Sequence, residues 1–100
     1  MAKQIIWSLL AQKDRKEILH YWRIRNQSTN YAQKLNLLFI KAIQLLAAHP
    51  HIGRSTEIQN IRVKLVRDYH IIYKETETRI EILTIWDNRR NPDELESRLK

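Results

Sequence analysis

The chain has 100 residues, a length that suits one domain with a modest core. It contains no cysteine, which excludes a disulfide framework, a Cys-based zinc site and a thiol nucleophile. No stretch approaches the roughly 20 apolar residues that cross a bilayer, and the N-terminus lacks the apolar core of a signal peptide. We therefore expect a single cytoplasmic domain over residues 1–100, with no membrane partner.

The charge is strongly basic and unevenly distributed. Lys and Arg number 18 against 11 Asp and Glu, a formal net charge of +7. Residues 1–50 hold eight basic and two acidic residues, a surplus of six, whereas 51–100 hold ten and nine, a surplus of one. Such a bias favours a polyanionic partner, either nucleic acid or an acidic protein segment.

The first half of the chain predicts a strand followed by two helices. Residues 3–8 are apolar and β-rich, and Ser8 is placed to cap a helix running from Leu9 to about Asn26. After a polar loop, apolar residues recur at helical spacing from Tyr31 to the His49-Pro50 pair, where proline ends the helix. Gly53 is the single glycine, and we expect it to serve a left-handed turn.

The second half predicts an antiparallel meander of three strands. Residues 61–65 alternate apolar and basic side chains, 69–73 are β-branched and aromatic, and 79–86 form the strongest strand pattern. A short terminal helix is expected over 93–99. The order β-α-α-β-β-β predicts an α+β fold in two layers, with the N-terminal strand and a helical hairpin packed on one face of a small antiparallel sheet.

These segments, in this order, resemble the RelE/ParE superfamily of toxins from type II toxin–antitoxin modules. The resemblance rests on Asp14-Arg15-Lys16-Glu17-Ile18 with Tyr21, on the turn from His49 to Arg54, and on Ile61-Arg62. It continues through residues 69–73 and the Arg89-Arg90-Asn91-Pro92 ending.

The resemblance implies a growth-inhibiting toxin of the kind found in plasmid stabilisation modules, held silent in a hetero-oligomer by an acidic antitoxin. Three apolar residues lie off the main apolar stripe of the second helix, so this helix has positions to spare for an amphipathic partner. The residues that we expect to bind the antitoxin are Leu37, Ile40 and Ile43.

Two mechanisms compete within the superfamily. RelE-like toxins cleave mRNA on the ribosome without a metal, and the resemblance then implies the catalytic residues Arg62, Lys64, His70 and Arg90. ParE-like toxins instead poison DNA gyrase and do no chemistry of their own. RelE-like toxins often end with a catalytic tyrosine or a His-Tyr pair, but nothing after Tyr73 is tyrosine or histidine. Asp87 is better explained as an ion-pair partner of the adjacent arginines. These departures weaken the nuclease case, and the Arg-Arg-Asn-Pro ending and the Pro-His-Ile-Gly-Arg turn resemble ParE-like members more closely, so we favour the ParE branch.

Neither branch calls for a cofactor or a metal, and His49 and His51 are better explained as turn residues than as metal ligands. A further alternative is a non-toxic basic module that binds nucleic acid or protein, although Tyr69 and Tyr73 are better explained by the core than by base stacking. We expect the cationic side chains to be displayed together on the sheet face opposite the helices, beside a tip at residues 88–92. The expected target-binding residues are Arg62, Lys64, Arg89 and Arg90.

Overall fold

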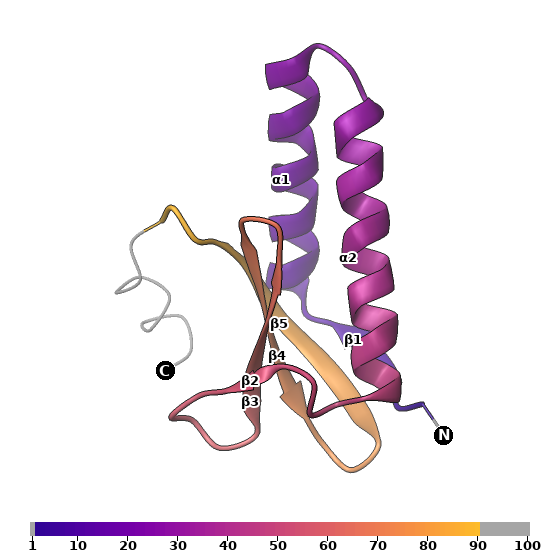
Figure 1. Cartoon of the computed structure of the whole chain (residues 1–100), viewed down its shortest axis with the longest axis vertical. Coiled ribbons are helices and arrows are strands. Elements are labelled where there is room, and N and C mark those ends of the chain that lie inside the picture. Colours follow the sequence, from indigo (N-terminus) through magenta and orange to yellow (C-terminus); the bar gives the residue numbers. More distant parts are fainter. Residues whose placement is uncertain (1, 91–100) are drawn as a thin grey trace.

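The computed structural model describes residues 2–90, and within them the predicted order of elements is confirmed (Figure 1). The expected helix at 93–99 and residues 91 and 92 of the tip lie outside this range. No helix between residues 2 and 90 is long and apolar enough to cross a membrane. The elements are β1 (Gln4–Trp7), α1 (Leu9–Asn26), α2 (Asn30–Ala48), β2 (Arg54–Ser55), β3 (Ile61–Val66), β4 (Tyr69–Glu75) and β5 (Arg79–Asp87).

The five strands form one sheet in the order β1-β5-β4-β3-β2. β3, β4 and β5 make the predicted antiparallel meander, β1 adds in parallel to β5, and the two-residue β2, which the sequence did not predict, pairs with β3. The two helices run side by side as a hairpin and pack on one face of the sheet (Figure 1). The core between the layers includes Phe39, Leu46, Ile71, Tyr73 and Ile82. The two-layer α+β fold is thus confirmed.

The start of α1 replaces β1 as the hydrogen-bonding partner of β5. β1 pairs with residues 79–82 of β5 and then ends. The Ser8 hydroxyl accepts the Ala11 amide as the predicted cap, at 2.9 Å, and donates to the Leu83 carbonyl at 2.7 Å. One turn later Asp14, which is 5% exposed, accepts hydrogen bonds from the Thr84 hydroxyl and from the Ile85 amide. The open edge of β5 is therefore closed by α1.

Gly53 is required for close packing and not for a left-handed turn. It does not have a positive φ, so the expectation from the sequence is wrong. A Cβ at this position would lie 2.4 Å from the Tyr73 hydroxyl oxygen. That hydroxyl accepts the Gly53 amide at 3.1 Å and donates to the Pro50 carbonyl at 2.8 Å. The buried tyrosine thereby ties the loop after α2 to the sheet.

We expect Asp14→Ala to lower the free energy of unfolding by about 2–4 kcal/mol, because it leaves the buried Thr84 hydroxyl and Ile85 amide without their acceptor. Urea unfolding followed by circular dichroism measures the change. Glu57→Ala, at an exposed position, serves as the control and should change stability by less than about 0.5 kcal/mol. Equal stabilities of the two variants would show that Asp14 does not hold α1 on the sheet.

Candidate functional site

The β3–β4 hairpin separates the cationic residues that the sequence grouped together. Arg62 lies opposite Tyr73, and Lys64 opposite Ile71, in the strand register. Cross-strand partners share a face, and Tyr73 and Ile71 belong to the core under the helices. Arg62 and Lys64 therefore lie on the helix side, and the expectation that they face away from the helices is wrong.

Arg62 and Lys64 can lie on the helix side because the helical hairpin does not cover the whole width of the sheet. Within the described residues, β3 contributes only Val66 to the core cluster, whereas β4 and β5 contribute three residues each. Arg62 and Lys64 are accordingly half-buried, and Leu65, on the opposite face, is 55% exposed. A strand near the edge of a sheet can thus carry charge toward the helix layer.

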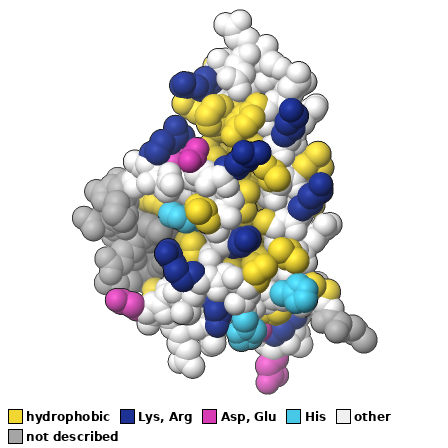
Figure 2. Space-filling model, viewed as in Figure 1, with side chains coloured by type: hydrophobic (Ala, Val, Ile, Leu, Met, Phe, Trp, Pro, Cys, Tyr) yellow, Lys and Arg dark blue, Asp and Glu magenta, His cyan; other side chains and the backbone are white. Residues whose placement is uncertain are grey.

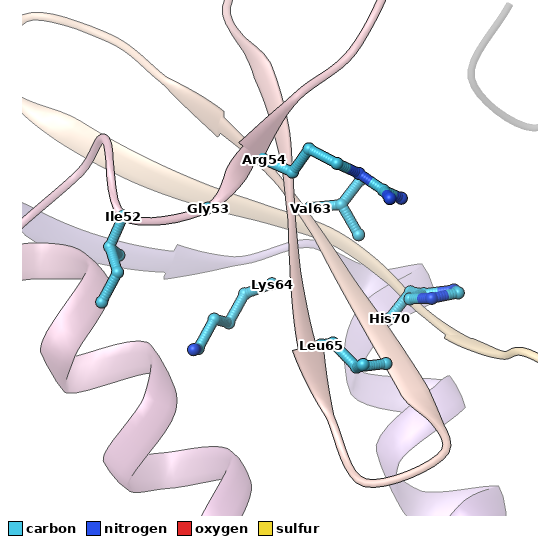
Figure 3. A pocket seen from close by; sticks show the side chains of 7 residues that line it. All are labelled: Ile52, Gly53, Arg54, Val63, Lys64, Leu65 and His70. Carbon is cyan, nitrogen blue, oxygen red and sulfur yellow. The ribbon is translucent and has the colours of Figure 1, made fainter.

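A hollow of about 250 Å³ lies at the outer edge of β3, and we name it the β3-edge notch (Figure 3). It forms because β2 pairs only with Arg62 and Val63, so that among the described strands none covers the edge of β3 at Leu65. In Figure 3 Lys64 points toward α2, whereas Arg54 and His70 point to the other side of the sheet. The lining residues are Ile52, Gly53, Arg54, Val63, Lys64, Leu65 and His70.

The surroundings of His70 lower its pKa. Burial lowers its pKa below the ordinary value of 6.5, and the nearby positive charge of Arg54 lowers the pKa further. It lies opposite Leu65 and Trp86 in the register, on the sheet face away from the helices. The imidazole therefore does not share a face with Arg62 or Lys64.

Arg62 braces the loop that follows α2. Its guanidinium donates to the Gly53 carbonyl at 2.9 Å and lies 3.1 Å from Nδ1 of His51. Nε2 of His51 is 3.2 Å from Glu75, whose other oxygen is 3.0 Å from Nζ of Lys3. Because Nδ1 accepts from Arg62, Nε2 carries the proton that is donated to Glu75. His51 thus has a turn role, as expected, but its two charged partners were not evident from the sequence.

At the end of β5 the two arginines have different environments. Asp87 pairs with Arg89, as the sequence predicted, and accepts hydrogen bonds from its Nε at 3.0 Å, its Nη2 at 2.7 Å and its backbone amide at 2.9 Å. These hydrogen bonds lower the pKa of Asp87 and raise that of Arg89. The Arg90 guanidinium lies 4.5 Å from the ring centre of Trp86, in cation–π geometry. Arg90 therefore lies at the Asp87 end of β5, whereas Arg62 lies opposite Tyr73, which pairs with Ile82 further back along β5.

The residues expected to bind the antitoxin are also separated. Leu37 is 55% exposed and Ile40 is half-buried, but Ile43 is 2% exposed and belongs to the core. Ile43 is thus not available to a partner.

The solvent-exposed side of α2 carries a different set of apolar and basic residues at spacing i, i+3, i+7 and i+11, which places them on one face. Figure 2 shows the side of the molecule seen in Figure 1, where hydrophobic side chains gather among Lys and Arg and acidic side chains are fewer. α2 contains no Asp or Glu. The set, named here the α2 stripe, consists of Lys34, Leu37, Lys41 and Leu45.

The comparisons with known proteins agree with this geometry. A family model described as "ParE toxin of type II toxin-antitoxin system, parDE" matches residues 5–92. A solved structure titled "Chromosomal ParDE TA system from P. aeruginosa" has the same fold, with a TM-score of 0.74 and 18% identity over 86% of this chain and 96% of that chain. No curated protein matches. The chain belongs to the ParE toxin family, so it is the toxin component of a type II toxin–antitoxin module and has an antitoxin as its partner.

We expect the protein to lose stability as the pH falls below about 6.5, in part because the unfolded chain accepts a proton on His70 more readily than the fold does. This part of the loss ends once the pH has passed the lowered pKa of the folded state. Urea unfolding at pH 7.5 and pH 5 should show that His70→Gln loses less stability than the wild type. His49→Gln is the control at an exposed position. The same pH dependence in both variants would contradict the prediction.

Proposed function

We propose that this toxin arrests growth in the cytoplasm by poisoning DNA gyrase and does not cleave mRNA. The observation that carries the proposal is the dispersal of the residues that a RelE-like nuclease would need. Cleavage at the ribose 2′-hydroxyl requires a base, a cation for the phosphate oxygens and an acid for the leaving oxygen around a single phosphate. Arg62 and Lys64 lie on one face of the sheet, whereas His70 lies on the other.

The individual side chains support the same conclusion. Arg62 is occupied by the Gly53 carbonyl and His51, and the guanidinium of Arg90 lies over Trp86. The lowered pKa of His70 suits a base, but the positive charge beside it is that of Arg54, and Arg62 and Lys64 lie on the other face of the sheet.

For the antitoxin we propose an acidic amphipathic segment that covers the α2 stripe. Leu37 and Leu45 are 55% and 41% exposed, and they alternate with Lys34 and Lys41 along one face of the helix. A helix with leucine or a similar residue at matching spacing would bury these leucines, and flanking carboxylates would pair with the lysines. The exposed Ile52 in the loop beyond α2 offers a further apolar contact.

The target is tested with the purified toxin in two assays run side by side. With DNA gyrase and supercoiled plasmid, we expect DNA–gyrase complexes to accumulate in the cleaved state, because a poison stabilises that state by binding to it. With translating ribosomes, we expect the mRNA to remain intact. Cleavage of mRNA that disappears in Arg62→Ala and Arg90→Ala, while both variants stay folded, would establish the nuclease in place of the gyrase poison.

The antitoxin surface is tested with the antitoxin encoded beside the toxin gene. Leu37→Ala and Leu45→Ala should each raise the Kd by about tenfold, since truncating a buried apolar anchor typically costs about 1–2 kcal/mol of binding free energy. Isothermal titration calorimetry measures the Kd. Leu9→Ala is the matched control, because Leu9 is 84% exposed and lies on α1. If only the control weakened binding, the antitoxin would not lie on α2.

A further inference from the structure

The outward side of α1 carries a row of basic residues that neither the toxin fold nor the proposed antitoxin surface uses. Lys13, Lys16, His20 and Arg23 stand at spacing i, i+3, i+7 and i+10, which places them on one face of the helix over about 15 Å. All four are exposed. They face away from the sheet, because Ala11, Asp14 and Trp22 occupy the opposite side of α1 and pack toward the core. We name this row the α1 stripe.

Little acidic charge neutralises the α1 stripe. Of the two acidic residues in α1, Asp14 is buried against β5 and Glu17 lies 4.0 Å from Lys13 in a single exposed pair. α2, the adjacent helix, has no acidic residue. An open hollow of about 490 Å³ lies along the stripe, lined by Gln12, Lys13, Arg15, Lys16, Leu19 and Arg23. The surface therefore offers several cationic donors around one concave area.

The two helices present different chemistry to a partner. The α2 stripe alternates lysine with exposed leucine, which suits a protein segment that has apolar anchors and acidic flanks. The four members of the α1 stripe, in contrast, all carry side-chain nitrogen, and the exposed Leu9 and Ile24 lie on the same face only at the two ends of the row. A phosphodiester backbone needs donors and positive charge at regular intervals and no apolar contact, and Arg and Lys supply most such contacts.

We propose that the outward face of α1 binds the phosphodiester backbone of nucleic acid, with Lys13, Lys16 and Arg23 as the principal phosphate contacts. The side chains contact the backbone and no base edges, so the binding is independent of sequence. Each cation that neutralises a phosphate releases counterions, which makes the affinity depend steeply on salt. This property is separate from the gyrase target, and its test contains neither gyrase nor antitoxin.

The test compares two triple variants of the full chain that lose the same positive charge. Lys13→Gln, Lys16→Gln and Arg23→Gln neutralise the α1 stripe, whereas Lys34→Gln, Lys41→Gln and Lys74→Gln remove three exposed lysines elsewhere. Fluorescence anisotropy between 50 and 300 mM salt measures binding to a labelled 20-base-pair DNA duplex, a single-stranded RNA of equal phosphate number, and poly-L-glutamate of equal charge. Circular dichroism and thermal unfolding establish that both variants are folded.

For the α1 variant we expect the slope of log K against log salt to fall by about 3 with nucleic acid, roughly one unit for each lost phosphate contact. The control should change the slope by less than about 1. Of duplex DNA and single-stranded RNA, the one whose affinity falls more in the α1 variant is identified as the ligand. Equal effects of the two variants would show that net charge alone attracts nucleic acid, and would overturn the proposal. If the α1 variant lost as much affinity for polyglutamate as for nucleic acid, the proposal would be overturned as well.

Discussion

The hydrogen bonds that the first turns of α1 make to β5 are the constraint on which the molecule depends. Where β1 ends, Ser8 and Asp14 take over as partners of Leu83, Thr84 and Ile85. A buried carboxylate is stable here because a hydroxyl and an amide both donate to it. Since Asp14 must point at β5, the rotation of α1 about its axis is set, and the opposite face of the helix is left to solvent.

That rotation gives the two exposed helix surfaces their different chemistry. With Asp14, Ala11 and Trp22 turned inward, the basic residues of the α1 stripe are turned outward, between the exposed Leu9 and Ile24. α2 packs through Leu35, Phe39 and Leu46, which leaves the α2 stripe outside. The two stripes thus suit partners of different chemistry, a protein segment on α2 and a phosphodiester backbone on α1.

The patterns along the chain predicted the local structure well, but they predicted poorly which residues from distant parts of the chain lie together. The Ser8 cap, the bounds of α1, the end of α2 before Pro50 and the Asp87–Arg89 pair were all evident, because each depends on neighbours in sequence. Ile43 was expected to bind the antitoxin, but it lies in the core and is 2% exposed, because tertiary packing decides which helix positions are buried. The role of Gly53 was also missed, because Tyr73, its packing partner, is 20 residues away.

The sequence by itself determined the order of the elements and the α+β class, because these follow from periodicity and caps, and its short motifs indicated the RelE/ParE superfamily. Alternation also placed Arg62 and Lys64 together on one face of β3, but it could not tell which face the helices would cover. The tertiary structure decided this, because a two-helix layer is narrower than a five-stranded sheet and leaves part of both faces of β3 exposed. It thereby separated the residues that a RelE-like nuclease would need and exposed the two helix stripes.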